Sequence, residues 1–416
     1  AAAVAAARTG AKTMLAEKYG CFGGALSVGQ VESYNWYFND KTYTSCGISS
    51  EIEQRMIAMG GTQHDDRGIG NFLNAEIYKI MLDRWVEEEG ITPLLHALAV
   101  DVVKDGDKVR GVIFESKSGC GAVLADCVID ATGDGDVAAL ADAQYHIGGT
   151  DARDVLPVTM VFGVSGVDVK TFRDYVQAHK EMITPETHGL KKVFLLAQQA
   201  GKWPYSREGG AWKTLTPSGD FTSLNITREF GIDGTNVWDL TRAEIEGHLQ
   251  LPKLVECLRK HVPGFENAYL TQIYPFIGIR ESRRFNGIST LKADSIIAGE
   301  IPEDSIGLGS YIIDIHDGGG AGTIVKKVPP YGLPYGVTVS ADIDNLMLTG
   351  RCVSVDSVVM SSLRVMPTCM VLGEGAGTAA AMAVKKKILP ADVNVKQLRK
   401  KLVENGVLMA PVEKKD

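Results

Sequence analysis

The sequence predicts an α/β protein whose apolar strands end in glycine-containing turns. Three segments that lie far apart along the chain carry this pattern. An alanine-rich helix leads through Gly10 into an apolar strand at 12–17. A second strand runs into the turn at 130–136, and a third ends at Gly350. Open α/β sheets bind ligands where their strands end, so we expect a binding site at these turns.

The composition is that of a folded protein with an acidic net charge. The 416 residues leave room for two interleaved domains at about 150 residues each. Hydrophobic residues make up 45% and charged residues 23%, which argues against intrinsic disorder. The formal net charge of −8 gives no general attraction to nucleic acid or to anionic lipid, so we predict neither as a partner.

Seven cysteines occur, and their number and spacing limit the kinds of site they can form. The number is odd and no C-x-x-C pair is present, which argues against a disulfide framework and against a zinc or iron–sulfur site. Reduced thiols are typical of cytoplasmic proteins, so we predict that location. No apolar run approaches the ~20 residues of a membrane helix, and we predict no membrane association and no bound metal.

The first 17 residues resemble the second half of a β-α-β unit. Alanine favours helix, Gly10 suits a helix end, and Glu17 ends the strand. In dinucleotide-binding units an acidic residue lies about 20 residues beyond the glycine fingerprint and binds a ribose. Counting back from Glu17, we expect the first strand and the glycine loop to be missing from this sequence. An alanine-rich helix beside any parallel strand is the alternative, and this segment alone leaves both open.

The next segments predict a helix, three strands and a turn that carries carboxylates. Helical periodicity is found at 71–89, and the expected strands are 92–103, 109–115 and 121–129, with a hairpin turn at 105–107. In the turn that follows, Gly133 would allow the backbone to pack against a cofactor, and Asp134 or Asp136 could accept a hydrogen bond from a hydroxyl group. A solvated turn with a helix-capping aspartate is the alternative.

Near the C-terminus a strand at 343–350 is followed by Arg351 and by a helix that begins near Pro367. Proline suits the first turn of a helix. The positive end of that helix could face an electron-rich group such as a reduced flavin. The glycines and alanines at 373–377 allow the helix to pack closely against neighbouring backbone.

Six segments in this order resemble the bacterial FAD-dependent oxidoreductases of the glutathione-reductase-like superfamily, which bind FAD or NAD(P) on a Rossmann-like fold. The likeness runs from residue 1 to about residue 408. The segments are Glu17 with 20–24, then 130–136, 278–284, 313–316, 349–351, and 364–368 with the helix that follows.

The resemblance implies a three-layer Rossmann-like FAD-binding domain that is discontinuous in sequence, with an inserted α+β substrate domain. Residues 1–142 and 336–385 would form the FAD-binding domain and 143–335 the substrate domain, with a helical tail at 386–416. The N-terminal strand and glycine loop of this fold would be the missing part.

The resemblance also implies which residues contact FAD. Glu17 would bind the adenosine ribose, the turn after the second strand would run along the diphosphate, and Gly350 with the start of the last helix would meet the ribityl chain and flavin ring. The implied contacts are Glu17, Lys18, Gly23, Gly24, Val102, Ala131, Thr132, Gly133, Asp134, Gly350, Arg351, Met366 and Thr368. The chain departs from its relatives at Asp356 and Ser357, where they often carry a histidine.

Candidates for catalysis lie in the inserted region. Arg280 and Arg283 could clamp a carboxylate or neutralise a developing enolate, and a structural ion pair with Glu281 is the alternative for at least one arginine of this segment. His316 is the best proton donor or acceptor by residue type. The glycine run at 318–322 predicts a flexible loop, and a lid is one use of such a loop.

The sequence therefore predicts an FAD-dependent dehydrogenase or reductase that transfers hydride between a small organic substrate and flavin N5. An electron-transfer subunit without a substrate pocket, which would pass electrons to a redox partner protein, is the alternative. A flavin-dependent RNA-modification protein fits less well because the chain has a net charge of −8 and no basic stripe.

Overall fold

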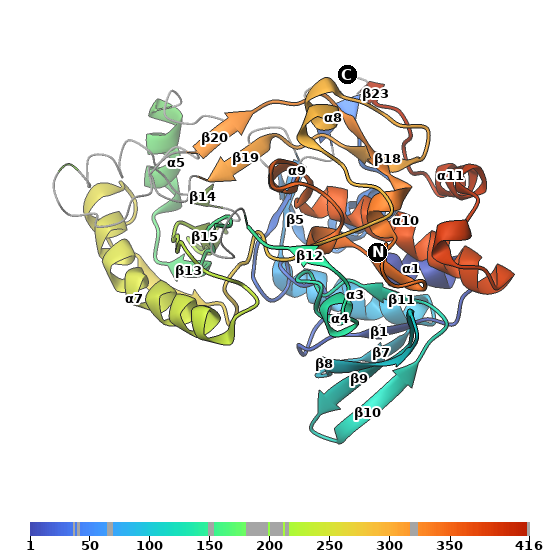
Figure 1. Ribbon diagram of the computed structural model, residues 1–416. Helices are drawn as coiled ribbons and strands as arrows, with labels where there is room; N and C mark the ends of the chain where they lie inside the picture. The colour runs from blue at the N-terminus through green and yellow to red at the C-terminus, as the bar shows by residue number, and fades with distance from the viewer. Residues whose placement is uncertain are drawn as a thin grey trace.

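The computed structural model describes residues 1–35, 38, 39, 42–64, 70–148, 154–179, 199, 211, 212, 216–316 and 323–413. Three clusters of buried hydrophobic side chains organise this part of the chain. The N-terminal core draws on residues 4–91, the inserted core on 158–277, and the main core on 102–143 together with 285–407. Figure 1 shows α5 (Val169–Ala178) and α7 (Val237–His261) of the inserted core at one side, apart from α1 (Ala2–Arg8) and α10 (Met366–Lys386).

The predicted parallel strands are present. β1 (Met14–Ala16) pairs in parallel with β7 (Thr92–Leu94), in a register that sets Met14 opposite Thr92. β11 (Val128–Asp130) pairs in parallel with β22 (Leu346–Leu348). Helices mixed with parallel strands confirm the α/β class, and the turns that follow β11 and β22 lie at one edge of their pair.

An antiparallel meander separates β7 from β11 along the chain. It consists of β8 (Leu98–Asp105), β9 (Lys108–Ser116) and β10 (Gly119–Leu124), and the predicted hairpin turn is confirmed because Asp105 pairs with Lys108. The single strand predicted at 92–103 is wrong. His96 takes a positive φ of 56°, which interrupts the extended backbone and divides the segment into β7 and β8.

The helix predicted at 71–89 begins later than expected. Residues 70–73 form β6 (Gly70–Leu73), which lies between β2 (Ser33–Asn35) and β5 (Thr62–His64). α3 (Ala75–Glu88) starts after Asn74, whose side chain accepts hydrogen bonds from the backbone of Glu76 and Ile77. The N-cap at Asn74 therefore sets the start of the helix, and the helical periodicity predicted a start that is too early.

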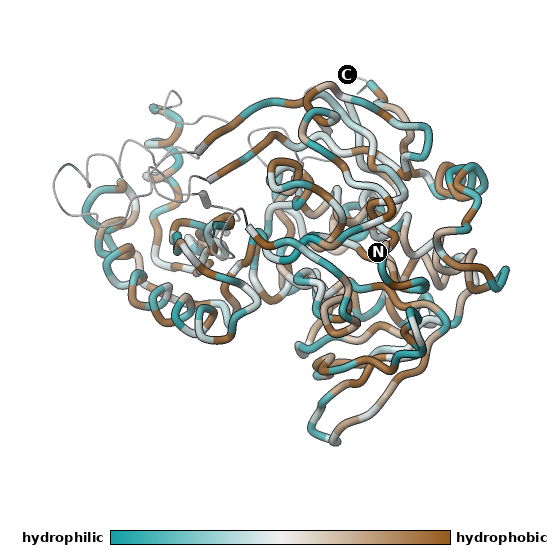
Figure 2. Tube along the Cα trace, viewed as in Figure 1, coloured by the Kyte–Doolittle hydropathy of each residue, from teal (hydrophilic) through white to brown (hydrophobic). Residues whose placement is uncertain are grey.

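The inserted core is built on an antiparallel sheet in the order β14-β15-β13-β16. These strands are β14 (Ala211–Trp212), β15 (Phe221–Asn225), β13 (Phe162–Ser165) and β16 (Tyr269–Ile273). Figure 2 shows teal and brown alternating along α7, as expected for a helix with one face in a core. Residues 285–348 pack in the main core instead. The predicted domain boundaries stay a prediction.

The remaining elements complete the main and N-terminal parts of the fold. They are β3 (Phe38–Asn39), β4 (Thr42–Tyr43), α2 (Ile48–Ala58), α4 (Asp136–Leu140), β12 (Tyr145–His146), β17 (Arg284–Phe285), α8 (Ala293–Ala298), β18 (Ser305–Gly309), β19 (Ile313–His316), β20 (Thr323–Lys326), β21 (Tyr331–Pro334), η2 (Tyr335–Thr338), η3 (Gly350–Cys352), α9 (Ser357–Leu363), η4 (Pro390–Asp392), α11 (Val395–Glu404) and β23 (Val412–Glu413).

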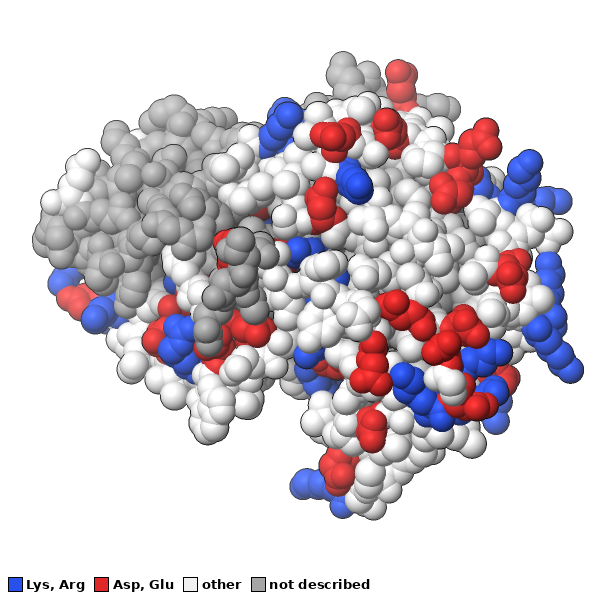
Figure 3. All heavy atoms as spheres, in the orientation of Figure 1, with Lys and Arg blue, Asp and Glu red and all other residues white. Residues whose placement is uncertain are grey.

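Acidic and basic side chains are interspersed on the face of the molecule drawn in Figure 3. Within the described ranges, no helix is both long enough and apolar enough to cross a membrane. All seven cysteines are free thiols.

The contact between α1 and α10 gives a test of the packing. A Cβ added to Gly377 would lie 2.1 Å from the carbonyl oxygen of Ala2, so Gly377→Ala must push the two helices apart. Overpacking of this kind costs about 1–3 kcal/mol of unfolding free energy, which denaturant titration of the full chain measures. Gly121→Ala is the matched control, because nothing lies within 4 Å of its added Cβ. An equal loss in both variants would contradict the packing argument.

Candidate functional site

The turn after β11 is held by the buried carboxylate of Asp130, which is 0% exposed. One oxygen accepts hydrogen bonds from the backbone and hydroxyl of Thr132, at 2.9 and 2.7 Å, and the other accepts from the backbone of Ala138 at 2.8 Å. Burial raises the pKa of Asp130, and these hydrogen bonds act against that rise. The carboxylate fixes both the turn and the start of α4.

Two glycines in this turn have backbone conformations that other residues rarely adopt. Gly133 has a φ of +85° and Gly135 a φ of +67°. A Cβ at Gly135 would lie 2.0 Å from the ring of Phe285, and a Cβ at Gly133 would lie 2.8 Å from a guanidinium nitrogen of Arg351. The close approach expected at Gly133 is therefore made, among the described residues, to the Arg351 side chain.

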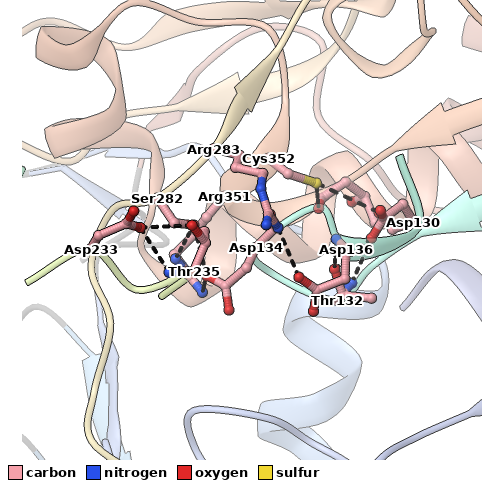
Figure 4. A network of polar contacts seen from close by, with 11 residues as sticks. Asp130, Thr132, Asp134, Asp136, Asp233, Thr235, Ser282, Arg283, Arg351 and Cys352 are labelled. Atoms are coloured by element: carbon pink, nitrogen blue, oxygen red, sulfur yellow. Dashed lines mark hydrogen bonds and ion pairs between the residues drawn. The ribbon is translucent and has the colours of Figure 1, made fainter. Parts of the chain in front are cut away.

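Asp134 joins three segments of the chain (Figure 4). Its Oδ1 accepts hydrogen bonds from Ser282 Oγ at 2.7 Å and from Arg351 Nη2 at 2.8 Å. The side chains of Asp134 and Arg351 are 8% and 18% exposed. Burial acts to raise the pKa of Asp134, but the charge of Arg351 and the hydrogen bonds from Ser282 and Arg351 lower it below its usual value. The alternative of a solvated turn is wrong for Asp134, since a buried ion pair holds it.

The arginines of the 278–284 segment have separate partners. Arg283 donates to the backbone oxygen of Asp134 at 3.1 Å and to the carboxylate of Asp136 at 2.9 Å. The structural ion pair expected with Glu281 is formed by Arg284. Arg280 takes part in neither contact. Arg283 thus holds the turn in place, whereas Arg280 contacts Pro157 and Thr159.

The end of β1 lies close to the same turn. Glu17 is partly buried, its side chain accepts from the backbone of Tyr19 at 3.1 Å, and burial raises its pKa. The positive charge of Lys18 helps to lower the pKa of Asp134. The ends of β1 and β11 therefore share one region, as a common binding site requires.

The predicted glycine contacts differ in their surroundings. A Cβ at Gly23 would lie 2.7 Å from the ring of Tyr78 and 2.9 Å from Leu82, so this glycine serves the packing of α3. Gly24 and Gly350 also have positive φ, but nothing lies within 4 Å of a Cβ added at either. These two glycines therefore face open space, so a cofactor could lie against their backbone without a steric clash.

Val102 and Ala131 lie at opposite extremes of burial. The Val102 side chain is 9% exposed and packs in the main core, and its backbone nitrogen donates to the Asp101 side chain at 2.8 Å. Ala131 is exposed at the edge of the β11 turn. The side chain of Val102 is therefore used by the core, and a contact of Val102 with FAD stays a prediction.

The start of α10 offers polar groups that lack partners. Its N-cap is Val365, which gives no side-chain cap, and Met366 and Pro367 begin the helix. The hydroxyl groups of Thr368 and Thr349 are buried and, among the described residues, form no hydrogen bond. Uncapped helical N–H groups and orphaned hydroxyls are the groups that a bound polar or anionic ligand satisfies. The residues at this place therefore fit a flavin cofactor.

The His316 side chain and the loop at 318–322 lie outside the described residues, whereas Asp356 has a structural role. His316 ends β19 and its backbone pairs with Thr323, but its side chain lies outside the described part of the structure, as does the loop at 318–322. Asp356 caps α9, accepting from the backbone of Val359 at 2.8 Å and of Ala293 at 2.7 Å. Within the described ranges, no group of His, Cys, Asp or Glu is arranged to hold a metal.

Ser282 and Thr349 belong to the site, although the sequence did not predict them as site residues. Ser282 lies inside a quoted motif, but the residue it binds is 148 positions away, so only the fold brings the two together. Thr349 directly precedes Gly350, and a polar residue at that strand end was an available signal.

The buried ion pair gives a test of the site's architecture. Asp134→Asn leaves the Arg351 charge without its partner, so we expect a loss of about 3 kcal/mol of unfolding free energy at pH 7. The pKa of Asp134 is lowered in the folded protein. The ionised carboxylate therefore stabilises the folded protein fully at a pH above its ordinary pKa of about 3.8. This stabilisation is lost as the pH falls through the lower pKa of the folded state. The unfolding free energies of the unaltered protein and of Asp134→Asn should therefore approach each other below about pH 4.

Asp105→Asn is the matched control, because Asp105 pairs with Arg110 while their side chains are 68% and 52% exposed. An exposed pair contributes little, and we expect a change within about 0.5 kcal/mol in the same denaturant titration. Equal losses of unfolding free energy in the two variants would show that the buried pair of Asp134 stabilises the protein no more than an exposed pair does.

Known structures resemble the chain over nearly its whole length, at low identity. A geranylgeranyl bacteriochlorophyll reductase-like protein from Thermoplasma acidophilum is 14% identical with a TM-score of 0.44, over 98% of this chain and 80% of that one. A p-nitrophenol 4-monooxygenase from Pseudomonas putida DLL-E4 is 10% identical with a TM-score of 0.43, over 97% and 80%. A myxobacterial chondrochloren halogenase is 11% identical with a TM-score of 0.41, over 96% and 75%. At these scores the likenesses carry no argument about substrate.

No curated protein matches the chain in sequence. Residues 1–402, however, match the sequence family described as FAD dependent oxidoreductase. The match covers well over half of the chain. The chain belongs to the FAD dependent oxidoreductase family, and its cofactor is FAD.

Proposed function

We propose that this protein is an FAD-dependent dehydrogenase or reductase that exchanges a hydride with a small organic substrate. The observation that carries the proposal is the contact of Ser282 and Arg283 with Asp134 and Asp136. It brings the segment that leaves the inserted core directly onto the turn assigned to the cofactor. A substrate held by that segment would lie beside the flavin.

The cofactor assignment follows the resemblance and the open positions at the strand ends. Glu17 would bind the adenosine ribose, residues 131–134 would follow the diphosphate, and Gly350 with the start of α10 would meet the flavin end. The parallel pairs β1–β7 and β11–β22, with the antiparallel meander β8–β10 between them in sequence, support a three-layer fold of the glutathione-reductase-like kind. A bacterial origin and a cytoplasmic location belong to the same proposal, and the free cysteines are in keeping with a reducing compartment.

When bound, FAD supplies the two-electron chemistry, in which a hydride moves between a substrate carbon and the flavin so that one is oxidised as the other is reduced. The residues of the chain supply position and charge. Arg283 holds the turn at 134–136, Arg280 is assigned to the charge of the substrate, and His316 is assigned to the proton. The role of His316 rests on its residue type alone.

The polar and enclosed surroundings of Asp134 favour a substrate-using enzyme over an electron-transfer subunit. A subunit that passes electrons to a protein would be expected to expose an apolar patch beside the flavin. The largest exposed apolar side chains of α7 are Trp238 at 79% and Leu249 at 68%. Figure 1 shows α7 along the outer edge of the molecule, away from β11 and α4. These exposed apolar side chains of α7 therefore lie away from the turn assigned to the cofactor.

The proposal is tested by the absorbance of the bound flavin under anaerobic conditions. Full-length protein loaded with FAD is mixed with small alcohols, amines and saturated acids, and the reduced protein with enones, ketones and unsaturated acids. We expect at least one compound to bleach or restore the flavin band specifically. A deuterated C–H bond in that compound should slow the step, since hydride transfer breaks it.

Flavin that responds to no small molecule, but is reoxidised rapidly by a one-electron protein acceptor, would overturn the proposal in favour of the electron-transfer subunit. Free FAD at the same concentration is the control for non-enzymatic reaction.

A further inference from the structure

Arg280 is a cation whose hydrogen-bond acceptors are neutral. It follows Gly278, whose backbone forms an antiparallel bridge with Thr159. One guanidinium nitrogen donates to the backbone oxygen of Pro157 and to the hydroxyl of Thr159, the latter at 2.6 Å. Both acceptors are neutral, and among the described residues Arg280 forms no ion pair. Its hydrogen bonds therefore leave its positive charge uncompensated.

Arg228 flanks the same strand segment from the other side. Its neighbour Glu229 exchanges two backbone hydrogen bonds of 3.0 Å with Val158, and the Thr159 hydroxyl donates to the backbone of Thr227 at 3.2 Å. Arg228 itself is 9% exposed. Two arginines thus lie on the strands at either side of residues 158–160, both at the edge of the inserted core.

Arg364 brings a third guanidinium from the main part of the fold. It lies between α9 and α10 and donates to Asp314 Oδ2 at 3.0 Å, which also accepts from Tyr311 at 3.0 Å. The Nε of Arg364 is buried and has no acceptor among the described residues. Asp314 therefore balances Arg364, and this pair lies one residue before the N-cap of α10.

The charges of Arg364 and Arg228 act on Arg280. The pKa of Arg280 is lowered to about 9, first by burial and then by the charges of Arg364 and Arg228, while Asp314 and Tyr311 act in the opposite direction. A neutral donor group would satisfy the oxygens of Pro157 and Thr159 without this repulsion. A guanidinium at such a place is favourable when an anion joins it.

We propose that Arg228, Arg280 and Arg364 form the binding site for a carboxylate group of the substrate. The inference rests on the proposed function and names its substrate class. Arg280 forms no ion pair among the described residues, and the planar guanidinium fork matches the two oxygens of a carboxylate. Because Arg364 adjoins the start of α10, the carboxylate would be held next to the region assigned to the flavin ring.

Binding of unreactive carboxylates tests this without any turnover. The FAD-loaded full-length protein is titrated with acetate, crotonate and benzoate, and in parallel with acetamide, crotonamide and benzamide. The thermal unfolding midpoint and the flavin absorbance band are recorded. We expect at least one carboxylate to raise the Tm and perturb the band in a saturable way, and the amide of the same shape to do neither.

Arg280→Gln is the variant that addresses the site, because it removes the positive charge and keeps a polar side chain that donates hydrogen bonds. We expect it to bind the same carboxylate at least about tenfold more weakly, which corresponds to about 1.4 kcal/mol. Arg110→Gln removes an exposed arginine of a surface pair and should leave binding unchanged. The comparison of acid with amide on the unaltered protein stands even where Arg280→Gln folds poorly.

Equal binding of acid and amide, no binding of any carboxylate, or unchanged binding in Arg280→Gln would each overturn the inference. Inorganic phosphate binding more tightly than every carboxylate would overturn the substrate class. Failure of the carboxylate-site inference can be distinguished from failure of the proposed function. A protein that binds benzoate through Arg280 but whose flavin reacts with no small molecule would contradict the proposed function and leave the anion site standing.

Discussion

The buried ion pair between Asp134 and Arg351 is the constraint on which the site depends. It connects the end of β11 to the end of β22, and through Ser282 it reaches the segment that returns from the inserted core. Removing one partner would leave an unpaired charge in a water-poor place, which is far more costly than losing a surface pair. The two strand ends and the inserted segment therefore hold one arrangement, and a cofactor and a substrate can be placed against the same frame.

The arginines of this region divide by whether their charge is balanced. Arg283, Arg284 and Arg351 each pair with a carboxylate, so their charges are used within the fold. Arg280 has only neutral acceptors among the described residues and lies near two further guanidinium groups. Charge balance thus separates Arg283, Arg284 and Arg351, which hold the architecture, from Arg280, which is available to a ligand. The same segment, 278–284, supplies both kinds, which places substrate recognition next to the contact that fixes the cofactor turn.

Much of the fold could be predicted from local sequence, but the hydrogen-bond and ion-pair partners of the site residues could not. Periodicity and glycine positions predicted the parallel strands, the hairpin at Asp105 and the helix at the C-terminal end. Boundaries failed where a single residue decides them, as with the positive φ of His96 and the N-cap at Asn74. The residues bound by Asp134 are 148 and 217 positions away, and Arg364 and Asp314 are 50 apart, so no local pattern carries those pairs. Their convergence is a product of tertiary structure.

Hydrogen exchange of the full chain with and without FAD tests the central claim most directly. If the Asp134–Arg351 pair marks the cofactor site, the backbone amides of 132–136 and 349–352 gain protection together when FAD binds. The amides of the meander tip near Gly119, which connects β9 to β10, should not change. FAD that binds while leaving both turns as they were, or that protects only one of them, would contradict the account.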